Sequence, residues 1–114
     1  MPSNGGATVD SNHVVVLVTA PHMDEAEAIA SRLLEAKLVA CANLVPGVMS
    51  LFWWEGKIDR AEEVLMVMKT TRERLDAVIA AVEEAHSYDV CEVVALPVIG
   101  GSAPYLAWVS ESVS

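Results

Sequence analysis

The sequence predicts an α+β fold, in which a sheet of four strands is covered on one face by two helices. Short apolar runs of strand length alternate with two segments whose apolar residues recur at helical spacing. Glycine and proline mark the boundaries between most of these segments. A further short helix is predicted at the end of the chain, and the elements follow one another without repeats or long linkers.

The first strand is predicted over His13–Ala20, HVVVLVTA, because β-branched residues dominate it and Pro21 ends it. The segment DEAEAIASRLLEAKL over residues 24–38 then carries apolar residues at helical spacing. Asp24 and Glu25 stand in its first turn, where negative charge suits the helix dipole. This segment is therefore predicted to be the first helix.

A long strand is predicted over residues 38–54, and the Pro-Gly pair at 46–47 predicts a bulge or break within it. The Glu-Gly-Lys stretch at 55–57 predicts a tight hairpin turn with glycine at a position of positive φ. The return strand is expected over residues 58–70, with an acidic patch before the apolar run VLMVMK.

A second helix is predicted over residues 72–86 and a fourth strand over residues 91–99, followed by a Gly-Gly pair. The terminal helix is expected over residues 104–113, with Pro104 in its first turn. The order is β-α-β-β-α-β plus a terminal helix, which is the ferredoxin-like arrangement with a long hairpin between its second and third strands.

The predicted strands are too apolar for a sheet with one face in water. They do not alternate apolar and polar residues at their centres, which are residues 14–18, 39–42, 64–68 and 93–96. Two helices cover one face of such a sheet, and no spare segment is large enough to cover the other. We therefore expect a homo-oligomer. Trp53 and Trp54 point to opposite faces of their strand, so the second is expected to lie against a neighbouring subunit.

Length and composition indicate one domain, over residues 13–114, preceded by a flexible tail over residues 1–12. The net charge of −9 argues against nucleic acid or an anionic membrane as a partner, because both attract clustered lysine and arginine. The tail lacks the features of a signal peptide, and no apolar run approaches the roughly 20 residues that span a bilayer. Two cysteines without a CxxC pair are expected to be reduced thiols of a cytoplasmic protein.

Several stretches together resemble the CutA family of divalent-cation tolerance proteins. They are LVTAP (17–21), LVACANLVPGVMSLFWWEGKI (38–58), EVLMVMKT (63–70), HSYDVCEVVALPV (86–98) and YLAWV (105–109). The resemblance implies a ferredoxin-like subunit that forms a compact homotrimer, like that of the PII signalling proteins. It also implies a role in tolerance of copper or another divalent cation. Ser87 and Cys91 depart from the family pattern, which usually has proline at both places.

His86, Glu92 and Cys41 are the candidate metal ligands, mainly on the strength of the resemblance. Imidazole and carboxylate suit a divalent ion such as Cu(II), and a thiolate would select Cu(I). The alternative for His86 and Glu92 is structural, with a hydrogen-bonded histidine and a carboxylate paired either with Lys69 or in an ion pair at a subunit interface. The alternative for Cys41 is an inert thiol buried within an apolar strand.

A second set of residues is a candidate small-molecule cleft between subunits, with apolar walls and a few polar tips. Its members are Trp54, Lys69, Tyr88, Tyr105 and Trp108. The alternative is that these aromatic side chains only bury the subunit interface. A PII-like regulatory module and a protein-anchoring scaffold are accordingly the rival functions to metal tolerance.

No motif of classical catalysis is present, so an enzyme is not expected. The sequence has no phosphate-binding glycine loop, no HExxH, no nucleophile elbow and no order of Ser, His and Asp that suggests a triad. His13 and His22 flank the first strand and are both expected to be solvated. The sequence leaves open which ion is physiological.

Overall fold

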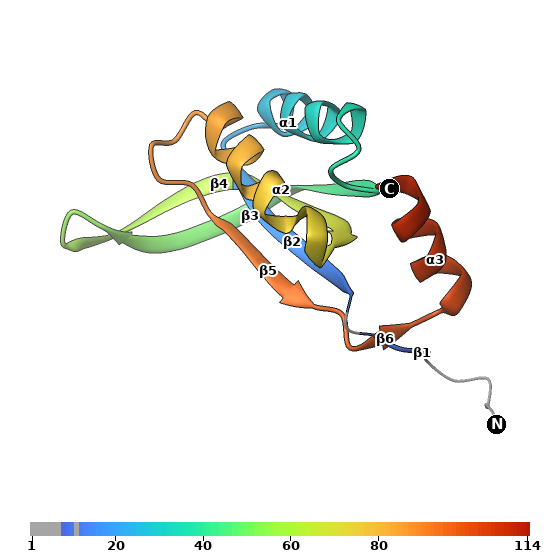
Figure 1. Ribbon diagram of the computed structural model, residues 1–114. Coiled ribbons are helices and arrows are strands. Elements are labelled where there is room, and N and C mark those ends of the chain that lie inside the picture. The colour runs from blue at the N-terminus through green and yellow to red at the C-terminus, as the bar shows by residue number, and fades with distance from the viewer. Residues whose placement is uncertain (1–7, 11) are drawn as a thin grey trace.

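The computed structural model describes residues 8–10 and 12–114. It is an α+β fold with an antiparallel four-stranded sheet in the order β3-β4-β2-β5, a two-stranded ribbon β1-β6 and three helices (Figure 1). The α+β class predicted from the sequence is thereby confirmed. The elements are β1 (Thr8–Val9), β2 (His13–Ala20), α1 (Met23–Glu35), β3 (Cys41–Trp54), β4 (Lys57–Thr71), α2 (Arg72–Ala85), β5 (Val93–Pro97), β6 (Gly100–Gly101) and α3 (Ala103–Ser112).

The long hairpin is built as its sequence predicts. The pairing of β3 with β4 shifts register between Val45 and Val48, which places a bulge at the Pro-Gly pair. At the tip, Glu55 has a φ of 50° and Gly56 a φ of 77°, the two positive values that a type I′ turn requires. The two-residue turn therefore sets the register of the hairpin strands.

Three predicted strand boundaries are wrong by two residues or more, since β5 also ends at Pro97 instead of residue 99. Strand β3 begins at Cys41 instead of residue 38, because residues 36–40 form the turn that leaves α1. Strand β5 begins at Val93 instead of residue 91, so Cys91 and Glu92 precede the strand. Alternation of faces along a strand consequently says nothing about which way these two side chains point.

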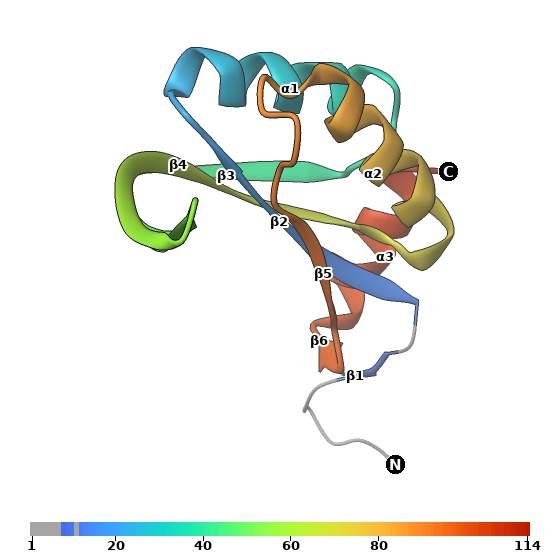
Figure 2. The same ribbon diagram turned by 90° about the vertical axis from the view of Figure 1, so that its left-hand side faces the viewer.

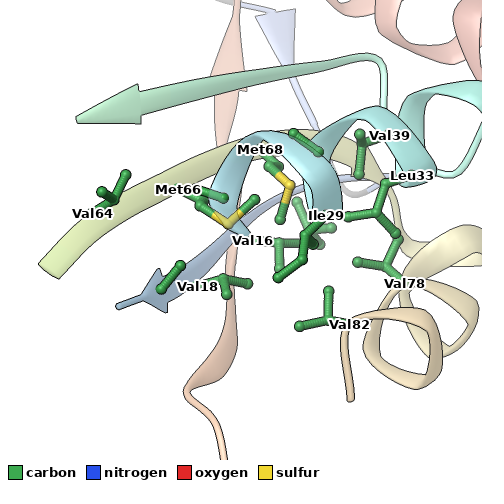
Figure 3. Close-up of a cluster of buried hydrophobic side chains, with 14 residues drawn as sticks. Val16, Val18, Ile29, Leu33, Val39, Val64, Met66, Met68, Val78 and Val82 are labelled. Carbon is green, nitrogen blue, oxygen red and sulfur yellow. The ribbon is translucent and has the colours of Figure 1, made fainter. Parts of the chain in front are cut away.

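Helices α1 and α2 lie on one face of the sheet and enclose the hydrophobic core, as Figures 1 and 2 show. Even-numbered residues of β2 and β4 meet apolar residues of both helices there (Figure 3). The largest buried side chains of this cluster are Val16, Val18, Ile29, Leu33, Val39, Met66, Met68, Val78 and Val82. Met66 and Met68 are fully buried, as their position in the strand predicts.

The opposite face of the sheet, here called the open face, is only partly covered. Helix α3 lies over one end of it and buries Leu106 and Val109 (Figure 2). On the open face of β5, Val94 is 48% exposed and Leu96 is 51% exposed, although both are large apolar residues. The open face thus presents apolar surface to solvent in the isolated subunit.

The β3–β4 hairpin extends well beyond the two-layer body (Figure 1). It makes the subunit elongated, with principal extents of 54 × 28 × 22 Å. Its apolar side chains are exposed: Leu51 by 68%, Trp53 by 74%, Trp54 by 60% and Ile58 by 65%. No helix in the described part of the chain is long and apolar enough to cross a membrane.

Strand β1, which precedes β2, pairs with β6 in a two-stranded ribbon. Thr8 and Val9 pair with Gly101 and Gly100, and the Asp10 N–H donates to the Ile99 carbonyl at 3.0 Å. Of the tail predicted over residues 1–12, residues 1–7 and 11 lie outside the described residues. The described part of that segment is attached to the folded body by these hydrogen bonds.

Candidate functional site

His86 is buried at the end of α2, and both of its ring nitrogens have partners. Nε2 donates to the Thr19 carbonyl oxygen at 2.7 Å, and Nδ1 accepts from the Tyr88 N–H at 3.0 Å. Because the carbonyl can only accept, Nε2 carries the hydrogen and Nδ1 offers its lone pair to the amide. In this arrangement, neither nitrogen has a free lone pair for a metal ion.

Side chains around His86 form a polar cluster, the His86 cluster, made of Glu25, Glu63, His86, Ser87 and Tyr88. Tyr88 Oη donates to the buried Glu63 carboxylate at 3.1 Å. Ser87 donates to Glu25 Oε2 from its N–H at 3.0 Å and from its hydroxyl at 2.9 Å. Glu25 Oε2 lies 3.5 Å from His86 Nδ1. The cluster fastens the chain after α2 to β4 and to the start of α1.

The pKa values of Tyr88 and Glu25 in this cluster are shifted. Burial raises the pKa of Tyr88, and the neighbouring Glu63 carboxylate raises it further. Burial alone would raise the pKa of Glu25, but the two hydrogen bonds from Ser87 and the nearby His86 lower it below its ordinary value. The folded protein therefore favours an ionised Glu25 and a neutral Tyr88.

Glu92 and Cys41 come from other segments of the chain than His86. Glu92 is exposed just before β5, and Cys41 is the half-buried first residue of β3, where its Sγ lies 3.5 Å from Tyr105 Oη. Within residues 8–10 and 12–114, no group of three or more His, Cys, Asp or Glu side chains is arranged to hold a metal ion. The single subunit does not gather the three predicted ligands, and their role in metal binding stays a prediction.

The candidate cleft residues lie at three separate places. Lys69 and Tyr105 line a cavity of about 180 Å³ between β4 and α3, and Trp108 packs against Tyr105 with ring centroids 5.7 Å apart. Trp54 stands at the hairpin tip, and Tyr88 belongs to the His86 cluster. In one subunit, only Lys69, Tyr105 and Trp108 form part of a common site.

Cys41 and Asn43 join that site from β3. Cys41 is the register partner of Lys69, and the Lys69 ammonium donates to the Asn43 side-chain oxygen. The hydrogen bond with Cys41, together with burial and the charge of a neighbouring thiolate, raises the pKa of Tyr105 to about 12. The site combines a cation, a thiol, a neutral phenol and an apolar wall at one end of the open face.

The prediction that His13 is solvated is wrong. This residue is 7% exposed, not solvated, and hydrogen-bonds to Asp10 and Ser110, whereas His22 is exposed as expected. Glu63 is likewise buried with a partner. The spacing of Asp10 and His13 was visible in the sequence, but Ser110 is 97 residues away and had no local sign.

Comparison with known proteins agrees with this fold over almost the whole chain. Residues 14–112 match the family described as CutA1 divalent ion tolerance protein. The chain belongs to this family. It is 45% identical over 101 residues to the divalent-cation tolerance protein CutA of Archaeoglobus fulgidus, covering 89% of this chain and 98% of that protein.

Other relatives support the same assignment. The chloroplastic protein CutA 1 of rice is 43% identical over 99 residues, which are 87% of this chain and 56% of the rice protein. The structure of CutA from Synechococcus elongatus superposes with a TM-score of 0.91 at 32% identity, covering 96% of this chain and 97% of that one. The chain spans just over half of the rice relative's length, so the activity of that longer protein as a whole is not transferred to it.

Proposed function

We propose that this chain acts in divalent-cation tolerance as a cytoplasmic, ferredoxin-like homotrimer that binds Cu(II) or a similar ion. The observation that carries the proposal is the family match over residues 14–112. The net charge of −9 agrees with it, because an acidic surface attracts cations. Binding, not chemical conversion, is the activity that this role requires.

The exposed apolar surface supports assembly. Val94 and Leu96 on the open face and Leu51, Trp53 and Ile58 on the hairpin are all close to half exposed or more. Apolar patches of this kind on a single subunit mark interaction surfaces. Three subunits arranged with their open faces inward and their hairpins reaching to neighbours would bury both.

Assembly also bears on the metal ligands. One subunit does not bring His86, Glu92 and Cys41 together, but a trimer holds three copies of each. Glu92 is exposed and offers a carboxylate without loss of an internal contact. His86 would have to give up the Tyr88 N–H or the Thr19 carbonyl before binding an ion. We therefore expect Glu92 to contribute more readily than His86.

Calorimetric titration of Cu(II) into the trimer tests this proposal. Glu92→Gln keeps the shape of the side chain and removes its charge, so we expect weaker binding by about 1–2 kcal/mol, in the range of a charge-assisted contact. His86→Gln tests the second ligand, and His22→Gln at an exposed position is the matched control. Isotherms of Glu92→Gln and His86→Gln that both match wild type would remove these residues from the site.

A second candidate function is binding of a small molecule at the Lys69–Tyr105 site. The observation that favours it is the cavity of about 180 Å³, in which an apolar wall adjoins one ammonium group and one phenol. Such a combination suits a small anion with an apolar body. A ligand that binds the native state raises its melting temperature, so small carboxylates should stabilise wild type but not Lys69→Met.

A further inference from the structure

Three side chains that the family match leaves unexplained form a continuous hydrogen-bonded row. Asp10 Oδ2 lies 2.6 Å from His13 Nδ1, and His13 Nε2 lies 2.8 Å from Ser110 Oγ. Asp10 precedes β2, His13 begins β2, and Ser110 lies on α3. A carboxylate, an imidazole and a serine hydroxyl joined in this order are the parts of a nucleophilic serine centre.

The hydrogen-bond roles within the row follow from the chemistry of Asp10. Burial alone would raise the pKa of Asp10, but hydrogen bonds from the His13 side chain and from the N–H groups of His13 and Asn12 lower it below its ordinary value. The ionised carboxylate can only accept, so Nδ1 carries a hydrogen. In the tautomer with hydrogen on Nδ1, the lone pair lies on Nε2, which is 2.8 Å from the Ser110 hydroxyl oxygen.

His13 and Asp10 are held firmly in this geometry. Their side chains are 9% and 8% exposed. Asp10 Oδ1 accepts from the His13 N–H at 2.7 Å and the Asn12 N–H at 3.0 Å, which leaves Oδ2 for the imidazole. Such a fixed carboxylate is what keeps an imidazole in the tautomer of a general base.

A cavity of about 340 Å³ opens beside Ser110. It is lined by Asn12, by Glu73 and Arg74 in the first turn of α2, by Ser110 of α3 and by Val113 directly after α3. Of the row, Ser110 alone lines this cavity, and His13 lines the cavity of about 180 Å³. Arg74 Nε donates to the Val113 carbonyl at 2.8 Å and so fixes the start of α2 against the end of α3. The volume suffices for a small ester.

The first turn of α2 borders the same cavity. The Arg72 N–H donates to the Asn12 carbonyl, and the following N–H groups of Glu73 and Arg74 precede any intrahelical acceptor. In the described part of the chain, the Thr71 side chain makes no capping hydrogen bond to them. Backbone donors at a helix N-terminus are suited to a developing oxyanion.

We propose that Ser110, His13 and Asp10 form a nucleophilic serine centre that hydrolyses small esters in this cavity. His13 Nε2 accepts the proton of Ser110 as Oγ bonds to the ester carbonyl carbon. The carbon–oxygen bond to the alcohol then breaks, and Nε2 returns the proton to the departing alcohol. Water releases the acyl group from Oγ by the same two proton transfers, so ester and water give acid and alcohol. This activity is separate from cation binding and departs from the expectation of a non-enzyme.

Hydrolysis of p-nitrophenyl acetate by the purified full-length chain tests the proposal. Ser110→Ala should lower the rate about 100-fold, the contribution typical of an activated nucleophile and base. Ser112→Ala is the matched control, because Ser112 lies on the same helix with its hydroxyl bonded to the Trp108 carbonyl instead. Equal rates for wild type, Ser110→Ala and Ser112→Ala would overturn the proposal.

Covalent labelling separates catalysis from a purely structural link. An alkyl fluorophosphonate should phosphonylate Oγ with loss of fluoride, and peptide mass spectrometry should place the adduct on Ser110 in wild type. Asp10→Asn removes the carboxylate that positions His13, so labelling and kcat should both fall while KM changes little. A purely structural row predicts no adduct at Ser110, and that result would also overturn the proposal, whatever the stability of the variants.

Discussion

The two faces of the four-stranded sheet are chemically similar but differ in what covers them. On the face beneath α1 and α2, Val16, Met66 and Met68 are completely buried. On the open face, Val94 and Leu96 are about half exposed in the isolated subunit. Both faces are built from apolar residues of the same strands, so the difference lies in the partner. One face is buried by helices of the same chain, and the other is suited to burial by a partner outside it.

The strongest way to break the covered face is to place a charge within it. Met66→Asp would bury an unpaired carboxylate among apolar side chains, at a cost above the roughly 4–5 kcal/mol that marks an exceptional substitution. Since domains are stable by about 5–15 kcal/mol, we expect loss of the cooperative thermal transition. Circular dichroism during heating measures this.

Met66→Leu is the control for that experiment, because a volume-conserving apolar exchange costs below about 1.5 kcal/mol. A cooperative transition for Met66→Asp near the wild-type temperature would show that Met66 is not enclosed as described. The same outcome would remove the distinction between the two faces.

A charge on the open face should leave the fold intact and prevent assembly. Leu96→Asp places a carboxylate where we propose that subunits meet, and a desolvated unpaired charge is unfavourable in an interface. Sedimentation should therefore change from three times the 12.2 kDa of one chain to a single copy, with the circular dichroism spectrum retained.

Leu34→Asp is the matched control. Leu34 is 41% exposed on the outer surface of α1, so it undergoes the same chemical change at similar exposure on the helical layer. Its sedimentation should stay trimeric. If Leu96→Asp also stayed trimeric, the open face would not be the contact surface.

The parts of the fold that could be predicted from the sequence are those fixed by interactions between residues close together in the chain. The bounds of β2, the bulge after Val45 and the turn at Glu55-Gly56 depend on nearby residues, and all three were predicted correctly. The start of β5 was not, because Cys91 and Glu92 look strand-like only until the loop after α2 has to return to the sheet. The β1–β6 ribbon was not predicted, because it pairs residues some 90 positions apart in the chain.

The candidate site depended even more on distant contacts. His86 was a candidate metal ligand because of the resemblance. In the structure its ring nitrogens face Thr19 and Glu25, which come from the other end of the domain, and these contacts give it a structural role. His13 was expected to be solvated because nothing in HVVVLVTA indicates Asp10 and Ser110 as its partners. Side-chain pairing of this kind follows from the folded topology and not from spacing along the chain.

A substitution of His86, which links the end of α2 to the sheet, should have a smaller effect on stability than a charge in the core. His86→Ala leaves the Thr19 carbonyl and the Tyr88 N–H without their partner, and an unsatisfied buried group costs about 1–3 kcal/mol. Urea unfolding should show this loss. His86→Gln offers both a donor and an acceptor and should lose less. Equal losses for the two variants would assign the effect to packing instead of hydrogen bonding.

Glu25 provides the smallest and most specific effect, a change in how stability depends on pH. Its folded pKa lies below the ordinary 4.5, since Ser87 and His86 outweigh the effect of burial. A depressed carboxyl pKa contributes stability that is fully present above about pH 4.5 and is lost as pH falls through the folded pKa. Glu25→Gln should remove this contribution, of below about 1 kcal/mol, and flatten the decline in unfolding free energy on acidification. Glu27→Gln, at an exposed position on the same helix, should leave the decline as in wild type. If the unfolding free energy of both variants falls with pH as it does in wild type, the contact between Ser87 and Glu25 does not stabilise the packing of α1 against the chain after α2.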